Sequence, residues 1–383
     1  MASVLAMSRD GHRPATRVVH AGQPAATPGE PLLPGPVFAA PFHLPGDVDS
    51  APYGYGRYGN PTFTNYEAAI GELERGTATL FSSGMAASAA VLVALTRPGD
   101  VVVVPSDCYG AVRVLCEEHL ASRGVEIRLV PTDQILMEEA AEGARVVWAE
   151  TPSNPALDVL DIEALARATR RAGALLAVDS TLATPLALRP LELGADLVVC
   201  SDSKAMTGHG DLIMGHVAAA DPDLAGGVLR WRTLAGAVPG PMETWLAHRS
   251  LATLDVRLRR QSANALAIAG LLEGRADVSG VRYPGLPGHP AHELAARQMH
   301  GLFGPVVSFE LAGAAEARRF LDAASLVTEA TSFGGVHTLA ERRARWGMDA
   351  VPEGFIRLSA GIEDPDDLLA DIAGALDVAA GAA

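Results

Sequence analysis

The residue whose type most clearly indicates a chemical role in this chain is a lysine. Lys204 is the only lysine in 383 residues, and the other 29 of its 30 lysine and arginine side chains are arginines. Arginine stays protonated, whereas burial readily lowers the pKa of a lysine. A neutral lysine amine can attack a carbonyl group and form a Schiff base. Because the run 201–210 around it is rich in small, hydroxyl-bearing and glycine residues, the sequence predicts a chemical role for Lys204.

Other polar residues stand where predicted strands end. Asp179 and Glu150 each close an apolar run that reads as a strand. Ser201 and Ser203 follow a third such run. Ligands of open parallel sheets bind at the carboxyl ends of the strands. These side chains are therefore expected to lie in one site with Lys204.

A phosphate site is indicated by Ser83-Gly84-Met85, which lies between a predicted strand and a predicted helix. A helix N-terminus offers free N–H groups and the positive end of a dipole, and both suit a phosphate. An amine, a phosphate cradle and a strand-end carboxylate together favour pyridoxal phosphate as the cofactor. In this interpretation Lys204 bonds to the cofactor, the serines hold its phosphate, and Asp179 keeps its ring nitrogen protonated.

Several other kinds of site lack support. No Gly-x-Gly-x-x-Gly follows a strand, and no P-loop or Gly-x-Ser-x-Gly motif occurs. Proline interrupts the spacing between His289 and His292, so no metal site is predicted. Cys108, Cys116 and Cys200 lack a Cys-x-x-Cys spacing and are expected to be reduced thiols.

The composition is that of an ordinary globular enzyme, with 49% hydrophobic and 20% charged residues. A net charge of −15 argues against a nucleic-acid partner. No run approaches the roughly 18 apolar residues of a membrane span. The first residues, Met1 to Arg9, lack the pattern of a signal peptide, so a cytoplasmic enzyme is expected.

The elements that must position these residues alternate between strands and helices. Residues 1–57 are proline-rich and are predicted to form an irregular arm that contacts a neighbouring subunit. Asn60-Pro61 is a good helix start, with asparagine as the N-cap. Strands are predicted at 79–81, 101–104, 125–130, 145–149, 174–179 and 197–200, and helices at 85–96 and 161–172. Fully apolar strands that alternate with helices indicate an α/β fold with a mostly parallel sheet.

The pattern changes after Pro239-Gly240-Pro241. A long helical stretch is predicted at 243–272, followed by strands at 306–311, 326–330 and 355–359 and helices at 314–323 and 365–379. We therefore predict an arm at 1–57, a cofactor-binding large domain at 58–240 and a smaller α+β domain at 241–383.

Ordered blocks of sequence resemble one known family. They are Tyr-Gly-Arg-Tyr-Gly-Asn-Pro-Thr (55–62), Ser-Gly-Met-Ala-Ala (83–87), Glu-Thr-Pro-Ser-Asn-Pro (150–155), Val-Asp-Ser-Thr-Leu-Ala-Thr-Pro (178–185), Leu-Gly-Ala-Asp-Leu-Val-Val-Cys-Ser-Asp-Ser-Lys (193–204), Gly-His-Gly-Asp (208–211), Tyr-Pro-Gly-Leu (283–286) and Ile-Arg-Leu-Ser-Ala-Gly-Ile-Glu (356–363). The chain thus resembles the Cys/Met-metabolism family of fold-type-I pyridoxal phosphate enzymes. The resemblance implies the fold-type-I transferase fold, with pyridoxal 5'-phosphate as cofactor.

The resemblance also implies individual roles. Lys204 would be the Schiff-base lysine and proton shuttle, Asp179 the partner of the pyridine nitrogen, and Tyr109 an acid or base at the leaving group. The implied cofactor contacts are Tyr55, Arg57, Ser83, Gly84, Met85, Tyr109, Asn154, Asp179, Thr181, Ser201, Ser203 and Lys204. The implied substrate contacts are Asn154, Ser332, His337 and Arg357, with Arg357 forking to the α-carboxylate.

Tyr55 and Arg57 match family residues that reach the phosphate of a neighbouring subunit. The resemblance therefore implies shared active sites and a homo-oligomer, with a dimer of dimers as the usual assembly.

The sequence departs from the family pattern near the distal end of the substrate. Gly54 and His337 stand where glutamates are usual, and those glutamates can face the distal amino group of cystathionine. The segment Ala340-Glu-Arg-Arg-Ala-Arg-Trp346-Gly replaces the usual Pro-x-x-Met-Thr-His. The cofactor residues are thus complete while the distal pocket is altered.

The resemblance implies γ-elimination on a γ-substituted L-amino acid. The main expectation is the cystathionine γ-lyase reaction, which yields cysteine, 2-oxobutanoate and ammonia. A γ-replacement enzyme of the cystathionine γ-synthase type, acting on an O-activated homoserine, and a methionine γ-lyase are the alternatives. His337 would suit an anionic distal group, which keeps the replacement reaction open. An alternative of another class is a protein of this fold that has become a binding or regulatory module.

Overall fold

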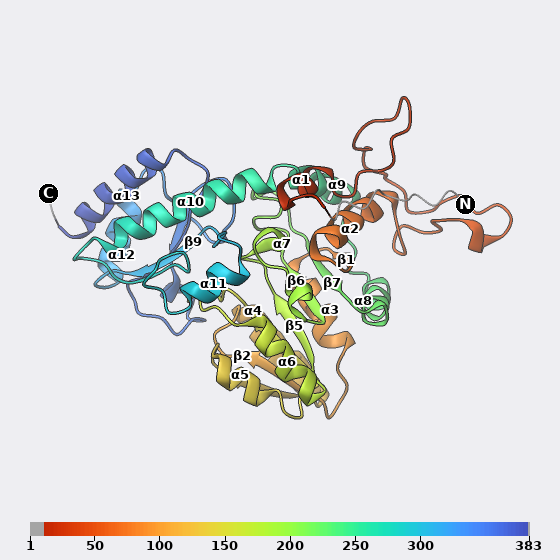
Figure 1. The fold of residues 1–383 in the computed structure, drawn as a ribbon, viewed down its shortest axis with the longest axis horizontal. Coiled ribbons are helices and arrows are strands. Elements are labelled where there is room, and N and C mark those ends of the chain that lie inside the picture. Colours follow the sequence, from red (N-terminus) through yellow and green to blue (C-terminus); the bar gives the residue numbers. More distant parts are fainter. Residues whose placement is uncertain (1–10, 382–383) are drawn as a thin grey trace.

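The computed structural model describes residues 11–381, which are built around two sheets (Figure 1). The strands of the large sheet are β1 (Thr77–Phe81), β2 (Val101–Pro105), β3 (Glu126–Val130), β4 (Val146–Glu150), β5 (Leu175–Asp179), β6 (Leu197–Cys200) and β7 (Gly215–Ala219). Their order is β1-β7-β6-β5-β4-β2-β3. The pairs among β2 to β6 are parallel, and β7 is antiparallel to both of its neighbours. The prediction of an α/β fold with a mostly parallel large sheet is confirmed.

The strand β7 is missing from the sequence prediction. Its sequence, Gly-His-Val-Ala-Ala, contains only one β-branched residue and so gives a weak strand signal. The tertiary structure shows why the strand begins with glycine. A Cβ atom at Gly215 would lie 2.7 Å from the Cα atom of Gly84, so only glycine allows this close approach.

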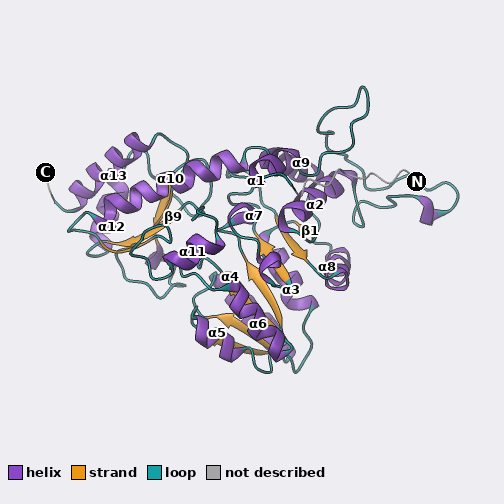
Figure 2. Ribbon diagram, in the orientation of Figure 1, coloured by secondary structure: helices purple, strands orange, loops and turns teal. Residues whose placement is uncertain are grey.

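Helices cover both faces of the large sheet (Figure 2). They are α2 (Pro61–Glu74), α3 (Gly84–Ala94), α4 (Gly110–Val114), α5 (Gln134–Ala140), α6 (Ile162–Ala172), α7 (Thr184–Ala187) and α8 (Pro222–Ala235). Helices α3 and α8 pack with Phe81, Val199 and Val217 on one face. Helices α5 and α6 pack with Val147 and Val178 on the other. Because successive side chains of a strand alternate between faces, fully apolar strands are buried on both sides.

The second sheet contains five strands in the order β10-β11-β12-β9-β8. They are β8 (Ser279–Arg282), β9 (Val306–Glu310), β10 (Thr328–Glu329), β11 (Leu339–Arg342) and β12 (Phe355–Ser359). The helices after residue 240 are α9 (Pro241–Leu251), α10 (Leu254–Glu273), α11 (His292–Gln298), α12 (Ala314–Ala323) and α13 (Pro365–Ala379), with a 3-10 turn, η5, at Arg343–Trp346. Helices α9 and α11 pack in one core with α2 of the large-sheet part, whereas α12, α13 and the second half of α10 cover the second sheet. Its core includes Ile268, Phe309, Phe320, Ile356 and Leu376.

The single helix predicted at 243–272 is wrong. The chain forms two helices, α9 and α10, with a break at Ala252 and Thr253. Arg257 stabilises the break, because its Nε donates to Thr253 Oγ1 at 3.1 Å and its Nη2 donates to the Ser250 carbonyl at 3.0 Å. No glycine or proline marks this position, so the helical periodicity alone hides it.

Residues 11–57 form the predicted arm, with a short helix α1 (Pro14–His20) and a 3-10 turn at Val48–Ser50. Its loops extend away from the body of the protein (Figure 1). Trp245 Nε1 of α9 donates to the Pro34 carbonyl at 2.9 Å and ties one part of the arm down. The contact of this arm with a neighbouring subunit and the domain boundaries at 57/58 and 240/241 stay predictions. Residues 1–10, which include the whole Met1–Arg9 segment that was predicted not to be a signal peptide, and residues 382–383 lie outside the described residues.

Among the helices within residues 11–381, none is both long and apolar enough to cross a bilayer.

Candidate active site

The carboxyl ends of β4, β5 and β6 face the second sheet across a cavity of about 340 Å³. Most of the predicted site residues line it, namely Ser83, Gly84, Met85, Tyr109, Asn154, Asp179, Thr181, Ser201, Ser203, Lys204, Ser332 and Arg357. Three do not: Tyr55, Arg57 and His337. Residues far apart in the sequence therefore meet because parallel strands end at one edge of a sheet.

Lys204 lies in a tight turn that follows β6. Its N–H donates to the Ser201 carbonyl at 3.2 Å, and its carbonyl accepts from the N–H of Gly208 at 2.8 Å. Burial lowers the pKa of Lys204, and the positive charge of Arg357 lowers it further, whereas Asp179 opposes both. The surroundings therefore favour the neutral amine that Schiff-base chemistry needs.

The N-terminus of α3 forms one wall of the cavity. Ser83 is the N-cap, and its Oγ accepts from the N–H of Ala86 at 3.0 Å. A Cβ atom at Gly84 would lie 2.6 Å from the Cβ atom of Ser201, so glycine is needed where the helix approaches the β6 turn. The helix N–H groups and the serine hydroxyls that line this end suit a phosphate.

Asp179 is held with one oxygen free. Its Oδ1 accepts from the N–H of Thr181 at 2.9 Å and from Thr181 Oγ1 at 2.6 Å. Within the described residues its Oδ2 accepts no hydrogen bond, and the side chain lines the cavity. Thr181 Oγ1 also accepts from the N–H of Ser201 at 2.9 Å. Thr181 thus fixes both the carboxylate and the turn that leads to Lys204.

Glu150 ends β4, as predicted, and has a role that its sequence position alone does not reveal. It pairs in register with Asp179 on the neighbouring strand. Its two oxygens accept from the N–H groups of Tyr109 and Asn154, both at 2.8 Å. Burial and the nearby Asp179 raise the pKa of Glu150 to about 8. One side chain therefore orients the segments that carry Tyr109 and Asn154.

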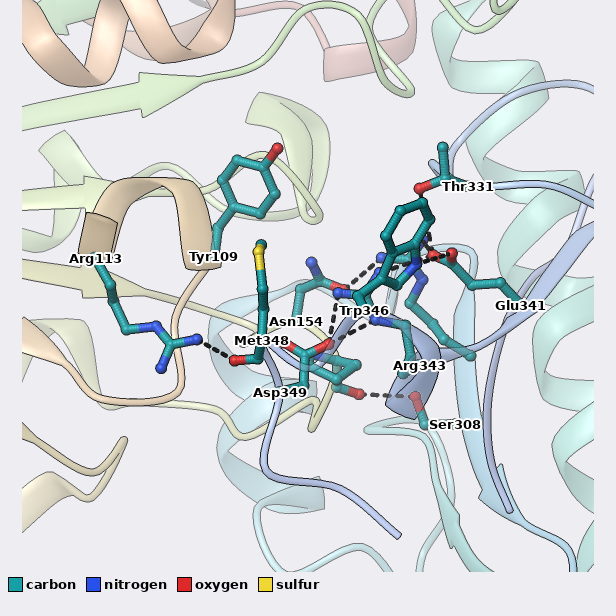
Figure 3. A network of polar contacts seen from close by, with 12 residues as sticks. Tyr109, Arg113, Asn154, Ser308, Thr331, Glu341, Arg343, Trp346, Met348 and Asp349 are labelled. Atoms are coloured by element: carbon teal, nitrogen blue, oxygen red, sulfur yellow. Dashed lines mark hydrogen bonds and ion pairs between the residues drawn. The ribbon is translucent and has the colours of Figure 1, made fainter. Parts of the chain in front are cut away.

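Tyr109 precedes α4, and its ring is 44% exposed beside the cavity (Figure 3). The segment after η5 crosses to this helix. Arg113 donates to the Met348 carbonyl, and a Cβ atom at Gly110 would lie 2.7 Å from the Met348 Cε atom. The second sheet and the helix of Tyr109 are thereby joined over the cavity.

Arg357 on β12 is 3% exposed and is held by several acceptors. Its Nη1 donates to Asn154 Oδ1 at 2.8 Å, and its Nη2 donates to the Ser332 carbonyl at 2.9 Å and to Glu341 Oε1. The two substrate residues predicted beside it, Asn154 and Ser332, therefore contact Arg357 directly. Burial and the nearby Arg343 lower the pKa of Arg357.

Sequence reasoning missed the charged residues around Arg357. Glu341 Oε1 also accepts from Arg343 Nη1 at 2.8 Å, and its Oε2 accepts from Trp346 Nε1 at 2.8 Å (Figure 3). Arg343 also pairs with Asp349, with 2.8 Å from Nε to Oδ2. We call Asn154, Glu341, Arg343, Asp349 and Arg357 the arginine corner. Its segment was recognised as unusual, but the sequence could not show which of its arginines points inward.

A second buried group of polar residues lies behind the Lys204 turn. His216 Nδ1 contacts Asp202 Oδ1 at 2.6 Å, and its Nε2 lies 3.4 Å from Glu74 Oε1. Tyr66 donates to Asp202 Oδ2 at 3.2 Å. We call Tyr66, Glu74, Asp202 and His216 the histidine network; all four are completely buried.

Cys200 also approaches this network, and its ligand atom and those of Asp202 and His216 lie within 4.8 Å of one another. Two ligands of one tetrahedral zinc, each about 2.1 Å from the metal, would be roughly 3.4 Å apart. The 2.6 Å contact between His216 and Asp202 is shorter and fits a shared proton. We therefore interpret the group as a hydrogen-bonded network.

The remaining predicted residues lie elsewhere. Tyr55 is 44% exposed, and Arg57 Nη1 donates to the Thr233 carbonyl at 2.8 Å on α8. His337 is exposed because its neighbours are anchored inward, Val336 by the Gly208 carbonyl and Thr338 by Glu363. The cavity of the single chain therefore does not include the predicted substrate contact of His337.

The cavity fits pyridoxal phosphate on structural grounds. It combines a lysine whose pKa is lowered, a helix N-terminus that glycine brings against Ser201, and a carboxylate oxygen of Asp179 that accepts no hydrogen bond from the described residues. These are the amine, the phosphate cradle and the ring-nitrogen partner that the cofactor requires.

Comparison with known proteins agrees with this fit. A family model described as Cys/Met metabolism PLP-dependent enzyme matches residues 16–377. The chain belongs to this family. It is therefore a pyridoxal-phosphate-dependent enzyme of the Cys/Met-metabolism family, and the expected fold, enzyme class and cofactor are confirmed.

Similar proteins differ in the reaction that their names give. A protein of Streptomyces coelicolor named "Putative cystathionine gamma-lyase" is 55% identical over 94% of this chain and 93% of its own length. A cystathionine gamma synthase structure from Xanthomonas oryzae pv. oryzae is 37% identical, with a TM-score of 0.91 over 96% of this chain and 99% of that one. A methionine gamma lyase structure from Micromonospora echinospora is 38% identical, with a TM-score of 0.90 over 96% and 100%.

Proposed function

We propose that this Cys/Met-metabolism enzyme catalyses γ-elimination on L-cystathionine, releasing cysteine, 2-oxobutanoate and ammonia. The observation that carries the proposal is one cavity lined by Lys204, Tyr109 and Arg357. These residues supply a mobile proton, a leaving-group acid and a carboxylate anchor. The choice of cystathionine is supported by the 55% identical relative, which is named as a γ-lyase.

Pyridoxal phosphate, when bound, would supply an aldehyde that bonds to amines and a ring that accepts electrons from the substrate Cα. Asp179 Oδ2 would keep a proton on the ring nitrogen. Ser83, Gly84, Met85, Ser201 and Ser203 would hold the phosphate at the start of α3.

Lys204 Nζ would take the Cα proton of the substrate, give that proton up to the cofactor, and then, as a neutral amine again, remove a Cβ proton, which its lowered pKa permits. Tyr109 Oη would donate a proton to the departing γ-sulfur. Arg357 would bind the α-carboxylate with a planar fork, beside Asn154 and Ser332. All of these residues line the same cavity, so their roles can be carried out on one bound substrate.

The test is product analysis with the purified enzyme. Incubation with L-cystathionine is expected to release cysteine and 2-oxobutanoate in equal amounts. L-Methionine serves as a second substrate, because methanethiol release would instead favour a methionine γ-lyase. Absence of 2-oxobutanoate among the products from cystathionine would contradict the proposal, even if ammonia is released.

A γ-replacement reaction is the second candidate, because the cystathionine gamma synthase structure matches with a TM-score of 0.91. Incubation with O-succinyl-L-homoserine and cysteine distinguishes the two reactions. A new thioether, formed faster than 2-oxobutanoate, would favour replacement over elimination.

We also propose a cytoplasmic homotetramer with shared sites. Buried free thiols at Cys108, Cys116 and Cys200 support a reducing compartment. Tyr55 and Arg57 lie outside the cavity of their own chain and would reach that of a partner. Mixing Lys204→Ala and Arg57→Ala subunits tests this arrangement, since hybrid assemblies would regain activity that neither variant shows alone.

A further inference from the structure

Arg343 is a second guanidinium at the cavity, and the proposed mechanism does not use it. It lines the cavity together with Arg357, although only 8% of its side chain is exposed. Both arginines donate to the same oxygen, Oε1 of Glu341. Arg343, which Figure 3 shows paired with Asp349, therefore belongs to the end of the cavity where Arg357 would hold the α-carboxylate.

Glu341 presents a problem for that binding site. Burial opposes its charge, but Arg357, Trp346 and Arg343 together lower its pKa, so it is anionic. A buried carboxylate in contact with Arg357 would cancel much of the attraction between Arg357 and a substrate carboxylate. Glu341 cannot turn away, because Trp346 Nε1 holds its other oxygen at 2.8 Å.

The charges of the arginine corner show what Arg343 contributes. Two arginines face two carboxylates, Glu341 and Asp349, so the corner is neutral as a whole. Without Arg343, Arg357 would face both carboxylates and the corner would be net negative. A net negative, poorly solvated corner repels a substrate carboxylate.

We propose that Arg343 is a positioning residue for substrate recognition, which neutralises Glu341 and so leaves Arg357 free to bind the α-carboxylate. The inference rests on the proposed function in one respect, namely that Arg357 binds the α-carboxylate of the substrate. It extends that function by placing one determinant of amino-acid affinity in the segment 341–349, which overlaps the stretch 340–347 that was predicted to depart from the family pattern.

The experiment measures binding of L-alanine to the enzyme loaded with pyridoxal phosphate, from the change in cofactor absorption. L-Alanine has no γ-substituent, so its binding can be measured even if the enzyme does not catalyse γ-elimination. Arg343→Met is expected to weaken L-alanine binding about tenfold or more, because a buried charge partner is lost. L-Alaninamide, which lacks the carboxylate charge, is expected to bind within about twofold of its wild-type affinity.

Arg342→Met is the matched control. Arg342 is adjacent in sequence but pairs at the surface with Glu353, which is 71% exposed. This variant is expected to bind L-alanine within about twofold of wild type. An equal loss in Arg342→Met and Arg343→Met would overturn the proposal, since the effect would then come from the segment as a whole.

Two further variants separate charge from structure. Glu341→Gln in the Arg343→Met background restores a neutral corner and is expected to recover most of the L-alanine affinity. Arg343→Lys keeps the charge and is expected to lose less affinity than Arg343→Met. If the double variant binds no better than Arg343→Met, or if lysine is as poor as methionine, the proposal is wrong. If Arg343→Met itself fails to fold, Arg343→Lys and the double variant are compared with wild type instead, and a loss of L-alanine affinity of about tenfold in both would overturn the proposal.

Discussion

The arginine corner and the histidine network both bury ionised groups, yet they differ in what can reach them. The corner borders the cavity, and four of its five residues come from one short part of the chain, Glu341 to Arg357. The histidine network has no exposed atoms and joins α2, the β6 turn and β7. A ligand can change the charges around the corner, whereas only protons or unfolding can change the network. The arginine corner is therefore suited to ligand binding, and the histidine network supports the turn that carries Lys204.

Lys204 lies between these two regions, and replacing it is expected to have the largest effect. Lys204→Ala removes the amine that moves protons at the substrate, so turnover should fall by at least about 10²–10⁴-fold. Steady-state assays of 2-oxobutanoate release measure this loss. Circular dichroism provides the control, because the fold should be retained. Near-normal turnover of the variant would show that another group performs the chemistry.

The histidine network should respond to mutation in stability and not in substrate affinity. His216→Leu leaves Asp202 and Glu74 buried without their shared partner, which typically costs about 3–5 kcal/mol of unfolding free energy. Denaturant unfolding measures the loss, and KM for the substrate is the control. A large rise in KM with unchanged stability would show that the histidine network acts on substrate binding and not on stability.

Arg357→Met should act mainly on substrate affinity. Loss of the guanidinium is expected to lower kcat/KM by roughly 10–100-fold, mainly through KM, because the substrate carboxylate loses its fork. Initial-rate measurements over a range of substrate concentrations provide the test. An unchanged KM would remove Arg357 from the binding site and would also undermine the role of Arg343.

The histidine network also predicts a pH dependence. Burial alone would lower the pKa of His216, but the carboxylates of Asp202 and Glu74 overcome this and raise it to about 10. Its charge then stabilises the fold fully below the ordinary pKa of about 6.5, and this stabilisation is lost as the pH rises through about 10. Unfolding measured at several pH values should show the decline. NMR of the histidine side chain should show a protonated ring at pH 8, and a neutral ring there would contradict the assignment.

The smallest effect is expected at His337, which is exposed and outside the cavity. His337→Ala should change kcat/KM by no more than about twofold, since surface substitutions away from special contacts cost little. The same assay as for Arg357→Met provides the comparison. A large loss of kcat/KM would show that His337 contributes to the active site of a neighbouring subunit.

Much of the cofactor site could be predicted from residue types and their order. Lys204, Asp179 and Ser83 were identified because an isolated lysine, a strand-end carboxylate and a strand–helix turn each have few chemical uses. Strands that are apolar at every position, and not only at alternate positions, also indicated the parallel sheet. The antiparallel β7 and the break between α9 and α10 were missed, because close packing of Gly215 and the bonds of Arg257 are not local signals.

The sequence by itself therefore determined the fold class and indicated the cofactor, and it predicted most of the residues that line the cavity at the edge of the large sheet. Those residues follow strand ends, and strand ends are visible in the pattern of apolar residues. Only the tertiary structure decided which of the arginines at 342, 343 and 345 faces the cavity, and that Glu341 contacts Arg357. The direction of a side chain depends on the register of β11 against β12 and on packing across the cavity, which no short stretch of sequence encodes.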